Sequence, residues 1–141
     1  MGFSILVRYG AAKPDVLASD ISSWWAKMET KTGDVNDIVM RLMALQPYRI
    51  VLFGSVASGL GASGSDIDLL VILDSEKISQ TYEERMQGRL MVRESLQAVN
   101  KLVPIDLIVF TKGEYEFLQK HGSSFLREIE SSGKTLYEKA N

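Results

Sequence analysis

Two apolar segments joined by a run of small residues constrain this chain more than its other features do. The first segment, residues 50–53, is followed by Gly54-Ser55. After ten intervening residues, Asp66-Ile67-Asp68 begins the second segment. Alternate residues of a β-strand point to the same face, so we expect Asp66 and Asp68 to project together, with Ile67 facing away. Two carboxylates held that close repel each other unless a cation lies between them. Because hard cations such as Mg²⁺ prefer carboxylate oxygens and share their shell with phosphates, the pair predicts a metal site.

The Gly-Ser end of the motif offers a place for those phosphates. Gly54 lets the backbone approach a ligand closely, and Ser55 adds a hydroxyl at what we expect to be the start of a short helix. Backbone N–H groups at the start of a helix point toward an anion. One end of the motif therefore suits phosphate and the other suits metal. That combination is typical of phosphoryl or nucleotidyl transfer, in which catalysis is mostly positioning and charge neutralisation.

A third carboxylate, Asp106, lies within another apolar segment, residues 103–110. A turn or a helix cap would explain the Gly-Ser-Asp run but not an aspartate on a third strand. Gly-Ser, ten residues, Asp-x-Asp and a later strand aspartate resemble the motif of the DNA polymerase β-like nucleotidyltransferases. More narrowly, the pattern is similar to that of their small prokaryotic members, the minimal nucleotidyltransferases. The resemblance covers about residues 34–139.

This resemblance implies a fold and a chemistry. The expected fold is α/β, a small mixed β-sheet with helices packed on it, over residues 34–141, preceded by a partly helical extension over residues 1–33. The implied reaction moves AMP from ATP to a hydroxyl group with the help of two Mg²⁺ ions. The site residues then divide into metal ligands and catalytic residues (Asp66, Asp68 and Asp106, the last as general base) and nucleotide-binding residues (Gly54, Ser55 and Ser65).

The chain departs from the family pattern directly after Gly-Ser. Many minimal nucleotidyltransferases continue with Arg-Ala-Arg-Gly, whereas residues 56–59 here are Val-Ala-Ser-Gly, so both arginines are missing. Arginine is the preferred fork for phosphate. Arg85, Arg89 and Arg93 share one face of a predicted helix. Three roles are open for these arginines: contact with phosphates, contact with an acidic surface of a partner, or an ordinary solvated helix face.

The resemblance leaves three acceptors or roles open. Larger superfamily members that modify aminoglycosides carry an extra helical domain to hold the drug, which favours a partner protein as the acceptor here. Minimal nucleotidyltransferases are often the antitoxins of helical HEPN-domain toxins and transfer AMP to a toxin tyrosine. The alternatives are transfer to a small hydroxyl compound such as an aminoglycoside, and a non-catalytic antitoxin that acts by binding alone.

Composition narrows the class of protein. A chain of 141 residues that is 45% hydrophobic and 24% charged is typical of one soluble globular domain. The net charge of −2 gives no strong sign of nucleic-acid binding. The chain has no cysteine, hence no disulfide or thiolate metal site. Without a membrane-length apolar run or a basic leader, we expect a cytoplasmic protein with no membrane contact. The sequence leaves open whether it is a monomer or an oligomer.

The apolar pattern also predicts the order of elements. We expect a helix from an Asp34 N-cap to about Gln46, strands near 49–53, 67–73 and 104–110, and one helical turn after the first strand. The longest helix is expected over 79–102, and its apolar stripe contains Tyr82, Met86 and Leu90, then Val92, Leu96 and Val99. Two short helices (113–120 and 123–131) and a last strand (135–137) follow. Residues 3–9 read as a strand or lead-in, and 15–30 as a helix ending at Lys31-Thr32-Gly33.

Overall fold

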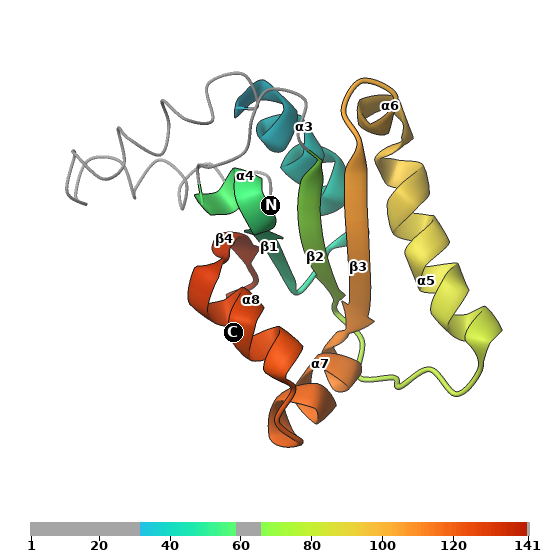
Figure 1. Cartoon of the computed structure of the whole chain (residues 1–141). Helices are drawn as coiled ribbons and strands as arrows, with labels where there is room; N and C mark the ends of the chain where they lie inside the picture. Colours follow the sequence, from blue (N-terminus) through green and yellow to red (C-terminus); the bar gives the residue numbers. More distant parts are fainter. Residues whose placement is uncertain (1–31, 59–65, 141) are drawn as a thin grey trace.

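The computed structural model describes residues 32–58 and 66–140 (Figure 1). The predicted elements at 3–9 and 15–30 lie outside this range, as does the N-terminal extension apart from its last two residues. In chain order the described elements are α3 (Thr32–Leu42), the 3-10 helix η1 (Met43–Leu45), β1 (Arg49–Phe53), α4 (Gly54–Ser58), β2 (Ile67–Leu73), α5 (Tyr82–Ser95), α6 (Gln97–Asn100), β3 (Ile105–Thr111), α7 (Lys112–Lys120), α8 (Ser124–Ser132) and β4 (Lys134–Glu138).

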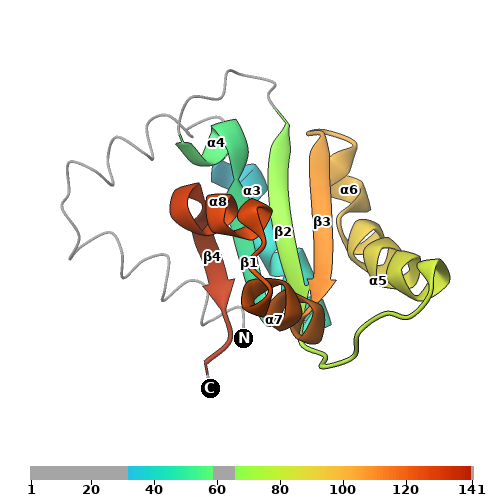
Figure 2. The same ribbon diagram turned by 60° about the horizontal axis from the view of Figure 1, so that its bottom comes forward.

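The strands form one mixed sheet in the order β3-β2-β1-β4. β1 is antiparallel to both β2 and β4, whereas β2 and β3 are parallel. A parallel pair needs a long crossover connection, and α5 and α6 supply it here. Because β2 and β3 run side by side in the same direction, both begin at the same edge of the sheet, which is also where β1 ends (Figures 1 and 2).

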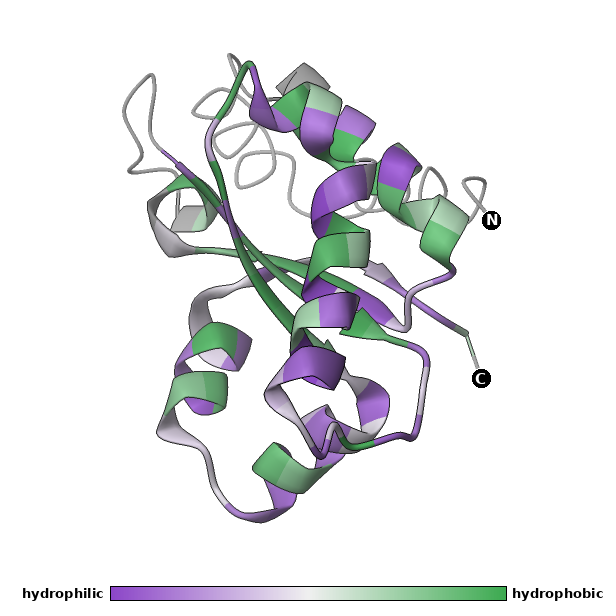
Figure 3. Ribbon diagram, turned by 90° about the vertical axis from the view of Figure 1, so that its right-hand side faces the viewer, coloured by the Kyte–Doolittle hydropathy of each residue, from purple (hydrophilic) through white to green (hydrophobic). Residues whose placement is uncertain are grey.

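Helices cover both faces of the sheet. One face packs against α3, α5 and α6 in a cluster that includes Ile38, Leu52, Leu69 and Leu96, each no more than 1% exposed. The other face packs against α7 and α8 in a smaller cluster around Leu70, Ile72 and Leu126. Burial of both faces explains why the strands read as nearly continuous apolar runs, green in the middle of Figure 3.

A polar network fastens β1 to the helices of the second face. The Arg49 guanidinium donates to the hydroxyl of Tyr115 at 2.7 Å, to Glu130 at 2.6 Å and to Thr135 at 2.9 Å. Burial, together with the hydrogen bond that the hydroxyl donates to Glu130, raises the pKa of Tyr115 to about 12. The network therefore links β1, α7, α8 and β4 through hydrogen bonds, part of which are charge-assisted.

The strand predictions are confirmed within one or two residues, and two helix predictions are wrong. α3 already includes Thr32 and Gly33, so Asp34 lies inside the helix and not at its N-cap. The long helix breaks at Leu96 into α5 and α6, and Thr81 caps α5 by accepting from the backbone N–H of Glu84. Of the predicted apolar stripe, Val92, Leu96 and Val99 are buried as expected, whereas Tyr82 and Leu90 are 72% and 47% exposed.

None of the helices in the described residues is long and apolar enough to cross a membrane.

Candidate active site

The mixed sheet brings two of the predicted aspartates directly opposite each other. Asp68 is the second residue of β2 and Asp106 the second of β3, and the two are register partners in the parallel pair. Neighbouring strands lie about 4.8 Å apart, so the two side chains leave the sheet from adjacent backbone positions. Asp66 precedes β2 by one residue. The sequence could predict each strand but not this register, which depends on how the crossover helices pack.

These carboxylates lie on the α7/α8 face of the sheet. Ile67, between Asp66 and Asp68, is fully buried in the opposite cluster with α3 and α5. The alternation of side chains therefore turns Asp68 toward the same face as Leu70 and Ile72, as the sequence predicted. Asp68 is half-buried, while Asp66 and Asp106 are exposed. The site is thus an open edge of the sheet with one carboxylate set deeper than the other two.

Gly54 is the backbone element that closes in on Asp68. The last residue of β1, Phe53, is the antiparallel partner of Asp68, and Gly54 turns the chain into α4 with a φ of 77°. A Cβ atom at Gly54 would lie 3.0 Å from Cγ of Asp68 and closer still to Oδ2. Only glycine meets both conditions, because L-residues seldom adopt this left-handed conformation and no side chain fits in the space.

The grouping of the three aspartates changes the acidity of the deepest one. Burial raises the pKa of Asp68, and the charges of Asp106 and Asp66 raise it further. Both other carboxylates are therefore within electrostatic reach. In the described part of the chain no three acidic or imidazole side chains are arranged to hold a metal ion as they stand. The oxygen donors nevertheless suit a hard cation, which would relieve their mutual repulsion, and rotation of their side chains on fixed strands could bring them together.

The nucleotide-binding predictions are tested less directly. Ser55 is the second residue of α4, as expected for the start of a short helix. Ser65 lies outside the described residues. Val56, at the position of the first missing arginine, is 4% exposed and packs in the core cluster with Leu52 and Val39. The residue that replaces this arginine therefore contributes to the hydrophobic core.

The arginines of α5 lie away from the carboxylates. α5 packs on the α3/α6 side of the sheet, whereas Asp68 and Asp106 lie on the other side. Arg85 lines a small cavity with Leu73 and Thr111, the last residues of β2 and β3. At about 3.3 Å per residue this is some 16 Å along the strands from the aspartates. Arg85 and Arg93 are exposed, and Arg89 is half-buried. The aspartates lie on the opposite face of the sheet, which argues against a contact between these arginines and phosphates bound there.

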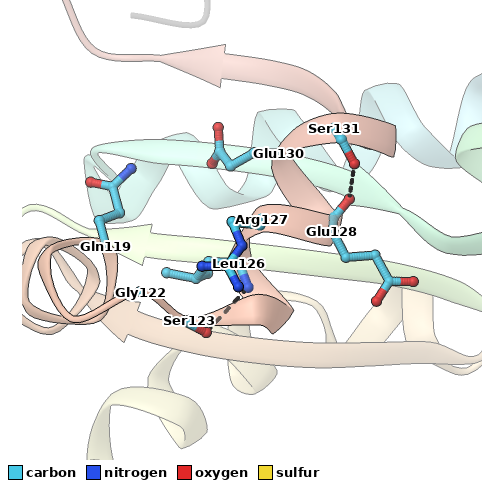
Figure 4. A pocket seen from close by; sticks show the side chains of 8 residues that line it. All are labelled: Gln119, Gly122, Ser123, Leu126, Arg127, Glu128, Glu130 and Ser131. Atoms are coloured by element: carbon cyan, nitrogen blue, oxygen red, sulfur yellow. Dashed lines mark hydrogen bonds between the residues drawn. The ribbon is translucent and has the colours of Figure 1, made fainter.

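Sequence reasoning missed a cavity that borders Gly54. It has a volume of about 330 Å³ and is lined by Phe53, Gly54 and four residues of α8: Phe125, Glu128, Ile129 and Ser132. The last three of these residues follow Phe125 by three, four and seven positions, a spacing that places all four on one face of a helix and can be read from the sequence. A larger, more open groove of about 880 Å³ runs along Gln119, Ser123 and Arg127 (Figure 4). None of the three aspartates lines that groove.

Comparisons with known proteins identify the family of this chain. A search of the curated proteins finds no match. Among solved structures, a chain from a crystal structure of "the toxin-antitoxin with AMP-PNP" is 22% identical, with 74% of this chain and 73% of that chain covered and a TM-score of 0.45. The family model of the nucleotidyltransferase domain matches residues 35–135. That span contains Gly54 and all three aspartates and takes in β1, β2 and β3. The chain belongs to the nucleotidyltransferase domain family.

Proposed function

We propose that this nucleotidyltransferase transfers AMP from ATP to a hydroxyl group, with Asp66, Asp68 and Asp106 holding Mg²⁺. The observation that carries the proposal is the register of the parallel strands, which sets Asp68 opposite Asp106 with Gly54 against the Asp68 carboxylate. Mg²⁺ bound there would neutralise phosphate charge and lower the pKa of the attacking hydroxyl. Membership of the family supports the reaction class, and the carboxylate donor set supports the choice of metal.

The residues of the chain have distinct tasks in this reaction. The turn at Gly54 has no side chain, which leaves room for the Asp68 carboxylate directly beside the backbone. The peptide groups of this turn would bind the phosphates. The acceptor oxygen attacks the α-phosphorus, the bond to the β-phosphate oxygen breaks, and pyrophosphate leaves with that electron pair. Asp106, exposed at the edge of the sheet, takes the proton from the acceptor hydroxyl. Asp66 and Asp68 orient the nucleotide through the metal.

We further propose that the acceptor is a hydroxyl of a partner protein, as in an antitoxin of the HEPN/MNT type. Exposure of Asp66 and Asp106 supports this choice, since the reacting edge is open to a large acceptor. The motif resemblance supports the partner class. The buried Val56 in place of an arginine favours one alternative, an antitoxin that only binds. Transfer to an aminoglycoside is the other.

The test uses the purified chain, Mg²⁺, labelled ATP and the product of the neighbouring gene. Asp66→Ala/Asp68→Ala runs beside the wild type, and the masses of both proteins are read. A gain of one or more AMP units on the partner, absent with the variant, supports the proposal. Labelling of an aminoglycoside without any partner would identify a small-molecule enzyme. Equal binding of the partner by both forms, with no mass gain, would establish the contact-only role and refute catalysis on that partner.

A further inference from the structure

The cavity beside Gly54 is lined by two aromatic rings and by one stripe of α8 that also carries Glu128, Ile129 and Ser132. Phe53, the last residue of β1, and Phe125, in α8, meet edge to face with centroids 6.3 Å apart at 88°. Phe125 is 40% exposed, so part of its ring is available to a ligand. A volume of about 330 Å³ lies at the lower end of the range of small-molecule sites, about 300–1,000 Å³.

The position of the cavity ties it to the reacting centre. Its walls include Phe53 and Gly54, and these are the strand partner of Asp68 and the glycine that touches the Asp68 carboxylate. A nucleotide whose phosphates lie at the Gly54 turn therefore has this cavity directly at hand. The α8 wall is held firmly, because Gly133 packs so closely that an added Cβ would lie 2.8 Å from Val51 of β1.

The polar side chains of the cavity accept hydrogen bonds and do not donate them to a ligand. The hydroxyl of Ser132 already donates to the backbone carbonyl of Glu128 at 2.8 Å, so only its lone pairs remain. The ionised carboxylate of Glu128 is acceptor-only, and within the described part of the chain no cation pairs with it. A ligand in this cavity must therefore present a flat apolar face to the rings and N–H donors to the helix.

We propose that this cavity holds the base of the incoming nucleotide, with adenine stacked on Phe125 and its amino group donating to Glu128. The inference rests on the proposed function, since it assumes that the triphosphate lies at Gly54. Aromatic side chains bind any base through its π face, whereas an acceptor-only wall selects among bases. Adenine, cytosine and guanine carry an exocyclic amino group that can donate to Glu128, whereas uracil has no such group and presents carbonyl oxygens that Glu128 repels. Phe125 is thus the stacking platform and Glu128 the residue that determines base specificity.

The experiment compares ATP with inorganic tripolyphosphate, which has no base. Equilibrium binding of each is measured with Mg²⁺ for the wild type, Phe125→Ala and Phe125→Trp. Phe125→Ala is expected to weaken ATP about tenfold while leaving tripolyphosphate unchanged, and Phe125→Trp to restore ATP binding. The matched control is Phe117→Ala. Phe117 lies in α7, is 51% exposed, stacks on His121 directly after that helix, and lines no part of this cavity.

A second arm tests base choice. Wild type is expected to bind ATP and CTP more tightly than UTP, and Glu128→Gln, which adds an N–H donor, is expected to narrow that difference. If Phe125→Ala leaves the ratio of the Kd values for ATP and tripolyphosphate unchanged, the inference is overturned while the proposed function stands. If Phe125→Ala instead lowers only the rate of transfer to an acceptor, the cavity belongs to the acceptor and the inference fails. Wild type that binds neither ligand would refute the proposed function as well.

Discussion

Replacing Gly54 with alanine separates the two reasons why glycine stands at this turn. The φ of 77° disfavours any L-residue, which costs about 1–2 kcal/mol. The added methyl group would also overlap Oδ2 of Asp68 and force that carboxylate to rotate. We therefore expect Gly54→Ala to lower the free energy of unfolding by at least about 1–2 kcal/mol, or some 4–8 °C in Tm for a domain of this size. Displacing Asp68 should also reduce nucleotidyl transfer by about 100-fold or more.

The chain offers a close control for the backbone part of this effect. Gly122, between α7 and α8, has the same φ of 77°, but an added Cβ there would meet only the end of the Arg127 side chain at 3.5 Å. Gly122→Ala should therefore lose a similar amount of stability and keep its transfer rate. Gly88→Ala, inside α5 with ordinary contact to Leu73, should be neutral or stabilising by about 0.5–1 kcal/mol.

Stability is measured by denaturant unfolding, and activity by pyrophosphate release under conditions in which every variant is folded. The contact between Gly54 and Asp68 is supported only if Gly54→Ala loses far more activity than Gly122→Ala at similar stability. Equal activity in the two variants would show that the turn does not position Asp68, and the account of the site built on it would be wrong.

Three other changes test separate parts of the structure. Burial and two like charges raise the pKa of Asp68, so the native state holds this proton more tightly than the unfolded state does. Stability therefore falls as the pH rises through the raised pKa. In denaturant titrations without divalent ions, Asp68→Asn should be more stable than wild type at neutral pH, and this gain should disappear near pH 3. Burial raises the pKa of Glu114, but the hydrogen bonds from the backbone N–H groups of Thr111 and Ser79 outweigh burial and lower it. The contribution of Glu114 to stability is therefore full above the ordinary glutamate pKa and is lost as the pH falls through the lowered pKa. Glu114→Gln should cost about 0.5–1 kcal/mol of stability at pH 7 and nothing in strong acid, and a pH-independent difference would contradict this. Arg85→Ala/Arg93→Ala should leave the Kd for ATP unchanged because α5 lies across the sheet from the aspartates, and a severalfold weaker Kd would show that these arginines reach the nucleotide.

The sequence predicted those parts of the fold that depend on local pattern. The apolar runs at 49–53 and 67–73 are strands because both of their faces are buried. Their short length and the turn residues beside them distinguish such runs from a buried helix. The α5 prediction failed where packing overrides local pattern. Tyr82 and Leu90 have helical spacing, yet both side chains are exposed, and Val92 is the buried residue of α5.

The candidate site was predicted in composition but not in arrangement. Spacing and alternation were enough to put Asp66 and Asp68 together. The pairing of Asp68 with Asp106 follows from a parallel register about 38 residues apart in the chain, which no local rule determines. The cavity beside Gly54 needed α8 to fold back onto the end of β1, and sequence alone shows only that residues 125, 128, 129 and 132 share a helix face.

Counting bound metal ions tests the central claim most directly. Mn²⁺ substitutes for Mg²⁺ at oxygen sites and is visible by electron paramagnetic resonance. With a non-hydrolysable ATP analogue, the wild type should bind two Mn²⁺ ions with magnetic coupling between them, whereas Asp106→Asn should lose one ion and Asp68→Asn should lose the coupled pair. The same Mn²⁺ stoichiometry and spectrum in all three proteins would contradict the assignment of these aspartates as the metal-binding centre of the nucleotidyl transfer.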